Sequence, residues 1–252
     1  MVQINKNRSL NLLQELIKNN LSKNLDYMPE SFNNEQQQAL ELFQKRVYLE
    51  EIIEETVAFN KSLVWNNSNE KVSLTTSAEE LIDVFKLRSD VYTKMNYNKE
   101  FPEIIEGLNF DDYDKNSAII YNKINSEVTG TCRLIFDSEK KLPIEEKYSF
   151  DYMREKHGSI GEVSRLTVKH KTEGLNLDFK NLTTGIYLVL RDNPINASIS
   201  VISKDHFKLY SKFGGFEIEK ELESYGNLNS TFVLTSWDIT KISKFFKKAF
   251  LN

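Results

Sequence analysis

The stretch Gly161-Glu-Val-Ser-Arg-Leu-Thr-Val168 has the alternating pattern of a β-strand, with two charges set among apolar residues. A period of two assigns its residues to two faces, with Val163, Arg165 and Thr167 on one and Glu162, Ser164, Leu166 and Val168 on the other. A carboxylate and a guanidinium therefore lie on opposite faces. Because burying an unpaired charge is costly, each needs a partner or a wet cleft. An edge strand with solvated charges is the alternative, but charged residues elsewhere in the chain are plausible partners.

Composition sets the class of protein around this strand. The 252 residues are 40% hydrophobic and 28% charged, which suits one globular domain with an extension, or two small domains. A net charge of −4 does not favour general nucleic-acid binding. One cysteine excludes an internal disulfide and indicates a reducing compartment. The N-terminus lacks the apolar core of a signal peptide, and no apolar run is long enough to span a membrane, so we expect a soluble, cytoplasmic protein.

The order of predicted elements indicates a helical N-terminal extension, residues 1–70, followed by an α/β domain, residues 71–252. The extension contains helices over 9–23 and 33–59, and the acidic face of the second is typical of a solvated surface. The domain is expected to hold strands at 71–75, 118–123, 127–137, 161–168, 197–203, 216–220 and 231–236, and helices from 77, at 178–192, 205–213 and 239–250. This order favours a mixed sheet flanked by helices over a doubly wound parallel one.

Further charged residues in the chain are candidate partners for the charges of this strand. Arg88 falls on the apolar stripe of the helix that Ser77 and Glu80 begin with a capping box. Arg133 lies in the middle of the strand over 127–137, whereas Asp111 and Asp114 end a long loop, 95–116, of the kind that is often functional. Arg88 taken alone is typical of a snorkelling side chain, and the aspartates alone of turn chemistry.

No metal site is predicted, because the three histidines and the aspartates lack ligand spacing. Cys132, in mid-strand with no identifiable base nearby, is interpreted as core rather than as a nucleophile.

The segment Asp205-His-Phe-Lys-Leu-Tyr-Ser-Lys-Phe-Gly-Gly-Phe216 resembles the penultimate helix and turn of the GNAT acyltransferases. Their Gly-rich pyrophosphate loop is absent after the central strand, where Lys171-Thr-Glu-Gly-Leu-Asn176 stands instead. Four motifs in order then resemble the acyl-homoserine-lactone (autoinducer) synthases and the related N-acyl amino acid synthases: Leu87-Arg88-x-x-x-Tyr92, Phe110-Asp111-Asp-Tyr-Asp114, Gly130-Thr-Cys-Arg133-Leu and Glu162-Val-Ser164-Arg165. The match spans roughly 80–220.

The resemblance implies a GNAT-like, mostly antiparallel central sheet and an N-acyltransferase with no permanently bound cofactor. It places a charged cluster at the acceptor side of the cleft, formed by Arg88, Asp111, Asp114, Arg133, Glu162 and Arg165. Tyr92 takes the place of an aromatic that orders a lid, and Tyr97 or Phe101 substitutes for a missing tryptophan. Asn109 stands where the lactone synthases, which serve quorum sensing, have Glu; this weakens S-adenosylmethionine as the acceptor and leaves room for an amino acid or another small amine.

The resemblance also implies a donor, usually an acidic acyl carrier protein, which Lys204, Lys208 and Lys212 around the penultimate helix would suit as docking residues. The C-terminal helix, 239–250, has a basic side with Lys241, Lys244, Lys247 and Lys248. It is interpreted as a docked helix with a solvated basic face; contact with an acidic partner or an anionic membrane surface is the functional alternative.

Acyl transfer to an amine needs a base, a site for the oxyanion and an apolar slot. Glu162 is the candidate base. Backbone N–H groups near Thr167 or Val168 are candidates for the oxyanion site, and Ser164 for shaping the pocket. Asp111 and Asp114 are expected to hold the amine, with Arg133 and Arg165 orienting them or binding a carboxylate. The acyl slot, or equally plain core, is expected from Leu134, Phe136, Leu166, Val189 and Ile199.

Two other functions stay open. An acyl-CoA or acetyl-CoA-dependent GNAT is disfavoured by the missing Gly-rich loop. A non-catalytic binding module is disfavoured because an idle cleft has no need of buried charges.

Overall fold

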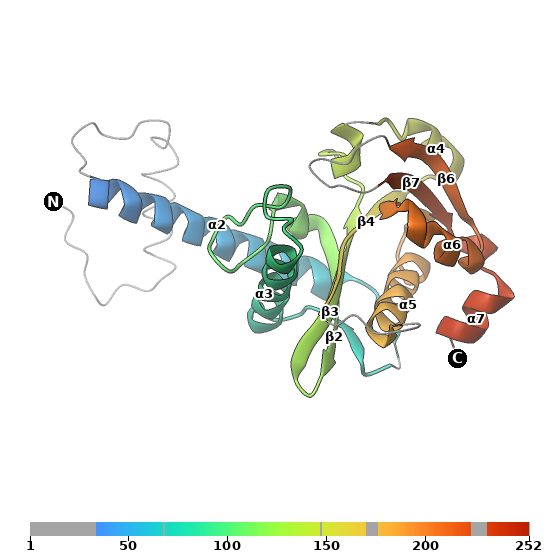
Figure 1. Cartoon of the computed structure of the whole chain (residues 1–252), viewed down its shortest axis with the longest axis horizontal. Helices are drawn as coiled ribbons and strands as arrows, with labels where there is room; N and C mark the ends of the chain where they lie inside the picture. Colours follow the sequence, from blue (N-terminus) through green and yellow to red (C-terminus); the bar gives the residue numbers. More distant parts are fainter. Residues whose placement is uncertain (1–33, 68, 147, 170–175, 223–230, 252) are drawn as a thin grey trace. The chain divides into compact units, whose positions relative to one another are not determined.

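A computed structural model of the chain describes residues 34–67, 69–146, 148–169, 176–222 and 231–251 (Figure 1). The helix predicted over 9–23 lies outside these residues. The chain divides into two compact units, Met1–Glu51 and Ile52–Asn252. Helix α2 (Asn34–Ser62) begins in the first and ends in the second, close to the predicted range of 33–59. The extension predicted over residues 1–70 stays a prediction.

The second unit is built on a seven-stranded sheet with the order β1-β2-β3-β4-β5-β7-β6. The strands are β1 (Val72–Leu74), β2 (Ser117–Ile124), β3 (Glu127–Phe136), β4 (Ile160–Val168), β5 (Ala197–Ser203), β6 (Phe216–Leu222) and β7 (Phe232–Asp238). Every neighbouring pair is antiparallel except β4 and β5, which are parallel. This confirms the expected mixed, mostly antiparallel sheet, and β4, which contains the stretch Gly161–Val168, is its central strand.

The parallel pair β4–β5 is joined over only part of its length. Pairing runs from Ile160 opposite Ala197 to Val163 opposite Ser200, and beyond that point the two strands part. On its other edge β4 stays paired with β3 as far as Val168, opposite Gly130. The divergence therefore opens the middle of the sheet between β4 and β5.

A bulge in β4 overturns part of the predicted alternation. Thr131 pairs with Thr167 and Arg133 with Ser164, so β4 holds one more residue than β3 between these positions. Arg165 lies in this bulge with a φ of 53°, a left-handed conformation that side chains other than glycine rarely adopt. The prediction that Glu162 and Arg165 point to opposite faces is therefore wrong, because the extra residue turns Arg165 to the side of Ser164 and Glu162.

Helices cover both faces of the sheet (Figure 1). Helix α3 (Ala78–Lys94) begins at the predicted capping box of Ser77 and Glu80 and packs against β3 and β4. Helix α5 (Leu177–Asp192) packs against β1, β2 and β3 on the other face. Its Leu182, Ile186 and Val189 share the main core with Cys132 of β3.

Short segments complete the second unit. They are the turns η1 (Asp112–Asn116), η2 (Pro143–Glu146), η3 (Lys204–His206), η4 (Ser211–Phe213) and η5 (Ile239–Lys241), and the helices α4 (Asp151–His157), α6 (Phe207–Tyr210) and α7 (Lys244–Phe250). Phe246 and Phe250 of α7 are buried against Phe213, with ring centroids 5.3 and 4.8 Å away. Among the described residues, no helix has the length and apolar character needed to span a bilayer.

Candidate active site

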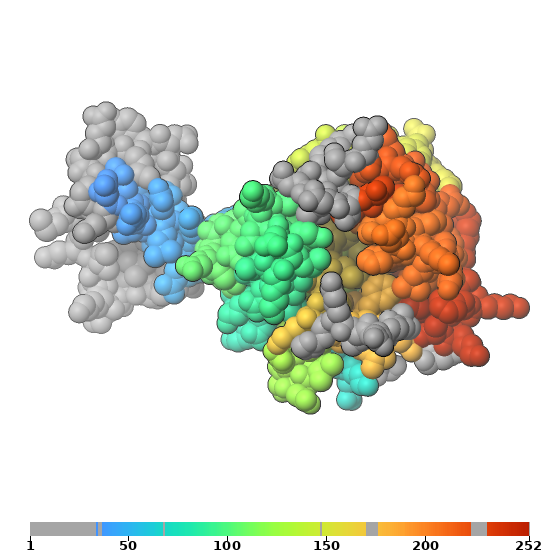
Figure 2. Space-filling view, in the orientation of Figure 1, coloured from blue at the N-terminus to red at the C-terminus, as the bar shows by residue number. Residues whose placement is uncertain are grey.

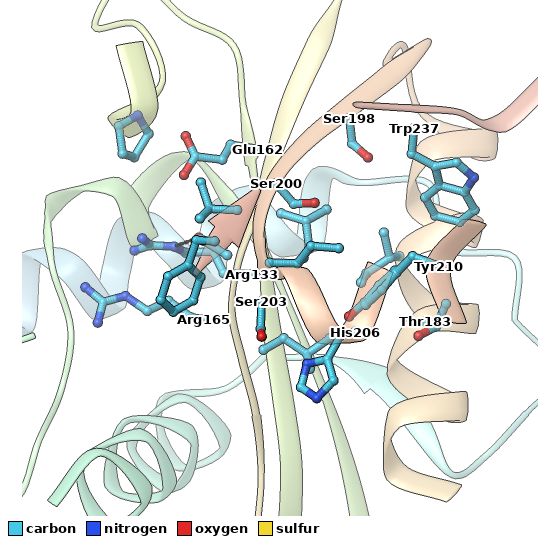
Figure 3. Close-up of a pocket in the computed structure, with 18 of the residues that line it drawn as sticks. Arg133, Glu162, Arg165, Thr183, Ser198, Ser200, Ser203, His206, Tyr210 and Trp237 are labelled. Atoms are coloured by element: carbon cyan, nitrogen blue, oxygen red, sulfur yellow. Dashed lines mark hydrogen bonds between the residues drawn. The ribbon is translucent and has the colours of Figure 1, made fainter. Parts of the chain in front are cut away.

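A cavity of about 520 Å³ occupies the opening between β4 and β5. Figure 3 shows its two ends: Glu162, Arg133 and Arg165 lie to one side of the strands, and Thr183, Tyr210 and Trp237 to the other. The first group faces α3 and the loop 95–116, whereas Thr183 belongs to α5. The cavity therefore passes through the sheet, with a charged end and a largely apolar end.

Asp111 is the centre of the charged end. It accepts hydrogen bonds from Arg133 (Nη1 to Oδ1, 2.5 Å) and from Arg165 (Nη2 to Oδ2, 2.7 Å). Burial acts to raise the pKa of Asp111, but the charges and hydrogen bonds of Arg133 and Arg165 outweigh it and hold the pKa well below its usual range. Asp111 lines the cavity, so an ionised carboxylate faces whatever binds there.

A second carboxylate lies behind the first, out of the cavity. Asp114 is 0% exposed and accepts a hydrogen bond of 2.9 Å from Arg88, which is also 0% exposed. Arg133 lies 3.3 Å from the same oxygen, and the other oxygen of Asp114 accepts the N–H of Asp111. Neither Arg88 nor Asp114, both predicted to touch substrate, lines the cavity; Asp114 contacts Arg88, Arg133 and the backbone of Asp111.

Arg165 links this cluster to the loop over the cavity. Its Nη1 donates to Asn109 Oδ1 (3.0 Å), and its guanidinium lies 4.4 Å from the ring centroid of Phe101 and 5.6 Å from that of Tyr92. Asn109 Nδ2 in turn donates to the carbonyl of Phe101. Phe101 and Tyr92 line the cavity, as does Tyr97. The stacked arginine thus holds the aromatic loop against the charged end.

Glu162 differs from the other carboxylates of the site. It is 6% exposed, lines the cavity and accepts a hydrogen bond of 3.0 Å from the N–H of Ile144. No cation forms an ion pair with it among the residues that the structure describes. Burial raises the pKa of Glu162 to about 7, because the Ile144 N–H and the Arg133 charge only partly offset it. At neutral pH this carboxylate is poised to take up a proton, as general base catalysis requires.

The side chains of the apolar end were mostly missed by sequence reasoning. Of the five predicted for the acyl slot, Leu166 lines the cavity, whereas Leu134, Phe136, Val189 and Ile199 belong to the core. The cavity is lined at this end by Thr183, Ile186, Tyr210, Phe213, Phe216 and Trp237. Tyr210, Phe213 and Phe216 fall in the segment that resembles the GNAT penultimate helix, which is the signal that could have identified them.

Other predicted residues lie in different places. Ser164 lines the cavity and accepts a hydrogen bond from Arg133 Nε (3.0 Å). Thr167 and Val168 do not line it, because both pair with β3 beyond the bulge. His206, which sequence reasoning did not single out, lines it at the end of β5.

The three lysines that are predicted to dock a carrier protein, Lys204, Lys208 and Lys212, are all exposed around α6, and Lys204 forms an ion pair of 2.7 Å with Glu221. Burial raises the pKa of the Cys132 thiol. No cluster of three potential metal ligands occurs in the described part of the chain.

The N-terminus of α5 is already capped by the chain itself. The side-chain oxygen of Asn176 accepts the N–H groups of Asp178 (2.8 Å) and Phe179 (3.3 Å). Asp178 is 5% exposed, and its carboxylate accepts a hydrogen bond from Asn122 (2.7 Å). A helix N-terminus that binds a pyrophosphate needs free N–H groups and no competing carboxylate. Here the amide oxygen of Asn176 takes up two of the N–H groups, and the buried Asp178 lies in the same first turn, bonded to β2 through Asn122.

Comparison with known proteins supports the resemblance. The family of N-acyl amino acid synthase FeeM matches residues 83–238. FeeM itself, from uncultured soil microbes, is 15% identical over 71% of this chain and 93% of its own, with a TM-score of 0.54. The acyl-homoserine-lactone synthase LasI is 16% identical with the same coverage and a TM-score of 0.52. The CoA-dependent lactone synthase MesI is 15% identical over 69% of this chain and 89% of its own, also at 0.52.

At such identities, the three structures establish a shared fold. A search of curated proteins found no match.

Proposed function

The chain belongs to the FeeM family of N-acyl amino acid synthases and is a GNAT-type acyltransferase, and on that premise we propose that it moves a fatty acyl group from acyl carrier protein to the amine of an amino acid. The observation that carries the proposal is that Glu162 and Asp111 both line one end of a cavity whose other end is apolar. One end suits an amine, and the other suits an acyl chain.

The reaction assigns a task to each side chain. The ammonium group of the acceptor binds Asp111, which stays ionised, and Glu162 accepts one proton from it, directly or through a water. The free amine attacks the thioester carbonyl, so that a C–N bond forms and the C–S bond breaks. The second amine proton leaves with the thiolate. Backbone N–H groups of β4 beside the gap, at Leu166 rather than at Thr167, are the candidates for holding the oxyanion.

The charge balance of the site favours an acceptor with a carboxylate. Arg88, Arg133 and Arg165 supply three positive charges, whereas Asp111 and Asp114 supply two negative ones. When Glu162 is protonated it is neutral, so the three arginines and two aspartates leave the site with a net charge of +1. Arg165, which is partly exposed to the cavity, is placed to bind a carboxylate. S-adenosylmethionine carries an additional sulfonium cation and fits this balance less well.

The donor proposal rests on the N-terminus of α5. Because Asn176 takes up two N–H groups of this helix terminus and Asp178 adds a negative charge to its first turn, a carrier-bound thioester suits the chain better than a CoA thioester. Lys208 and Lys212 are exposed beside His206 at the cavity and would contact the acidic carrier protein. Charge reversal at both (Lys208→Glu with Lys212→Glu) should raise the KM for acyl carrier protein and leave the KM for the amino acid unchanged.

The test is mass spectrometry of organic extracts from cells that express the protein, with the Glu162→Gln variant as control. N-acyl amino acids that vanish in the variant support the proposal, and the head-group mass distinguishes them from a homoserine lactone. Purified protein is then given the same acyl group on carrier protein and on CoA, with a mixture of amino acids. Faster turnover of the CoA thioester would overturn the donor assignment, and lactone products would overturn the acceptor.

A further inference from the structure

The last segment of the chain differs in charge from the rest. The whole sequence has more acidic than basic residues, 37 against 33. Residues 239–252, by contrast, hold Lys241, Lys244, Lys247 and Lys248 and no Asp or Glu. All four lysines are exposed, and only Lys241 forms an ion pair in the described part of the chain, with Asp238. Positive charge is therefore concentrated at one end of an otherwise acidic protein.

Two large apolar side chains are exposed among these lysines. Phe245 is 44% exposed and Leu251 is 37% exposed, although their neighbours Phe246 and Phe250 are buried. Scattered apolar residues are normal on a protein surface. Phe245 borders the lysines and touches the ring of Phe250 (centroids 6.4 Å apart). Exposed apolar side chains next to several lysines are the composition of a segment that lies in a lipid interface, where the lysines meet headgroups and the apolar groups enter the acyl boundary.

The inner side of the same helix covers the apolar end of the cavity. Phe213 and Trp237 line the cavity, and both pack on Phe246, with ring centroids 5.3 and 5.4 Å away. Helix α7 is anchored there by Ser243, which caps its first turn and donates to the carbonyl of Lys212 (2.6 Å). The basic outer side of α7 is thus one helix thickness from the part of the cavity that suits an acyl chain. Figure 2 shows α7 at the surface.

We propose that the outer side of α7, formed by Lys244, Phe245, Lys247, Lys248 and Leu251, binds an anionic lipid surface. An acidic protein that contacts the same lysines is the alternative, and the vesicle experiments below distinguish the two. The surface does not depend on the acyltransferase reaction. If that reaction is as proposed, its amphiphilic product leaves the enzyme beside a bilayer into which it partitions.

The test is sedimentation of the full chain with vesicles of phosphatidylcholine alone or mixed with phosphatidylglycerol, at low and at about 0.15 M salt. Each lysine near an anionic surface changes partitioning about fivefold. The α7 triple variant, in which Lys244, Lys247 and Lys248 are exchanged for Glu, should therefore bind at least about 100-fold more weakly. The matched control exchanges the exposed Lys61, Lys71 and Lys86 for Glu, which gives the same net charge and should bind nearly as wild type. Circular dichroism confirms that each variant is folded.

A second variant tests insertion. Phe245→Trp places a fluorophore in the interface, and its emission should shift to the blue with anionic vesicles and not with phosphatidylcholine alone. Phe245→Ser should weaken binding about tenfold.

Three results would overturn the proposal. The first is that the chain does not bind anionic vesicles at low salt, and the second is that the α7 triple variant and its control lose vesicle binding equally. The third is that an α7 variant raises the KM for acyl carrier protein and leaves vesicle binding intact. Activity without vesicles tests the proposed reaction separately, since the α7 variants should retain it.

Discussion

Replacing Glu162 by glutamine should abolish acyl transfer and at the same time stabilise the protein at neutral and higher pH. Glutamine has nearly the same shape, and its carbonyl oxygen can still accept the N–H of Ile144. What it lacks is the capacity to take a proton. Removing a general base typically lowers kcat by 10²- to 10⁴-fold, and we expect a loss in that range.

The pKa of about 7 fixes the pH dependence of the wild-type enzyme. The base must be ionised, and the ionised fraction rises from about one tenth at pH 6 to about nine tenths at pH 8. The kcat/KM for the acyl donor should therefore rise about tenfold across this interval. In the variant, the residual rate should not follow this curve.

The stability of the wild-type protein should fall as pH rises, whereas its rate should increase. The pKa of Glu162 is higher in the folded chain, about 7, than its ordinary 4.5. Between these values the folded state binds more protons, so the wild-type protein loses stability as pH rises through this window. Glutamine does not titrate. The stability of the variant relative to wild type should therefore grow by about 3 kcal/mol from pH 4 to pH 8.

Two measurements check this reasoning. Initial rates are measured by mass spectrometry of product from pH 5.5 to 8.5, and urea unfolding of both proteins is measured from pH 4 to pH 8. A variant that is inactive but less stable than wild type at pH 8 would mean that Glu162 has a structural role. A wild-type rate that is flat between pH 6 and pH 8, or a variant with the wild-type profile, would refute the assignment of Glu162 as base.

Three further outcomes are expected. Asp114→Ala leaves Arg88 buried without its partner and should lower the free energy of unfolding by about 3–5 kcal/mol, measured by urea denaturation; a loss below about 1 kcal/mol would contradict the buried pair. Arg165→Lys keeps the charge but loses the planar fork, so the KM for the amino acid should rise about tenfold with a smaller change in kcat; an unchanged KM in steady-state assays would remove Arg165 from acceptor binding. Asn176→Ala removes the cap of α5 and should cost about 1 kcal/mol, seen as a lower melting temperature, while an unaltered melting curve would show that solvent replaces the cap.

Local patterns predicted the elements of this fold well. The period-two alternation identified the central strand, and the Ser77–Glu80 capping box identified the start of α3, because both depend on residues close in sequence. The order of charged motifs pointed to Asp111, Arg133, Glu162 and Arg165, which the structure brings to one end of the cavity. Their assignment to catalysis stays a prediction.

Features that depend on pairing between distant strands were not predictable in this way. A strict alternation cannot show that an extra residue at Arg165 rotates the following side chains. Nor does it show that β4 and β5 part after Val163 and Ser200, which decides which apolar residues line a cavity and which fill the core. For this reason the sequence leaves Leu134 and Ile199 open between acyl slot and core, and the structure buries both fully in the core.

The four paired positions that join β4 to β5 also bear on how the protein folds. Strands β1 to β4 form one antiparallel ribbon, and β5, β7 and β6 form another. Closing the parallel junction through α5 takes about as much chain as pairing β3 with β4 or β5 with β7. Only four paired positions offset its loop-closure entropy, however, against six and seven in those two pairs. We expect the two ribbons to form early and their junction to form late. The cavity exists only once the ribbons have joined, so partly folded chains have no active site.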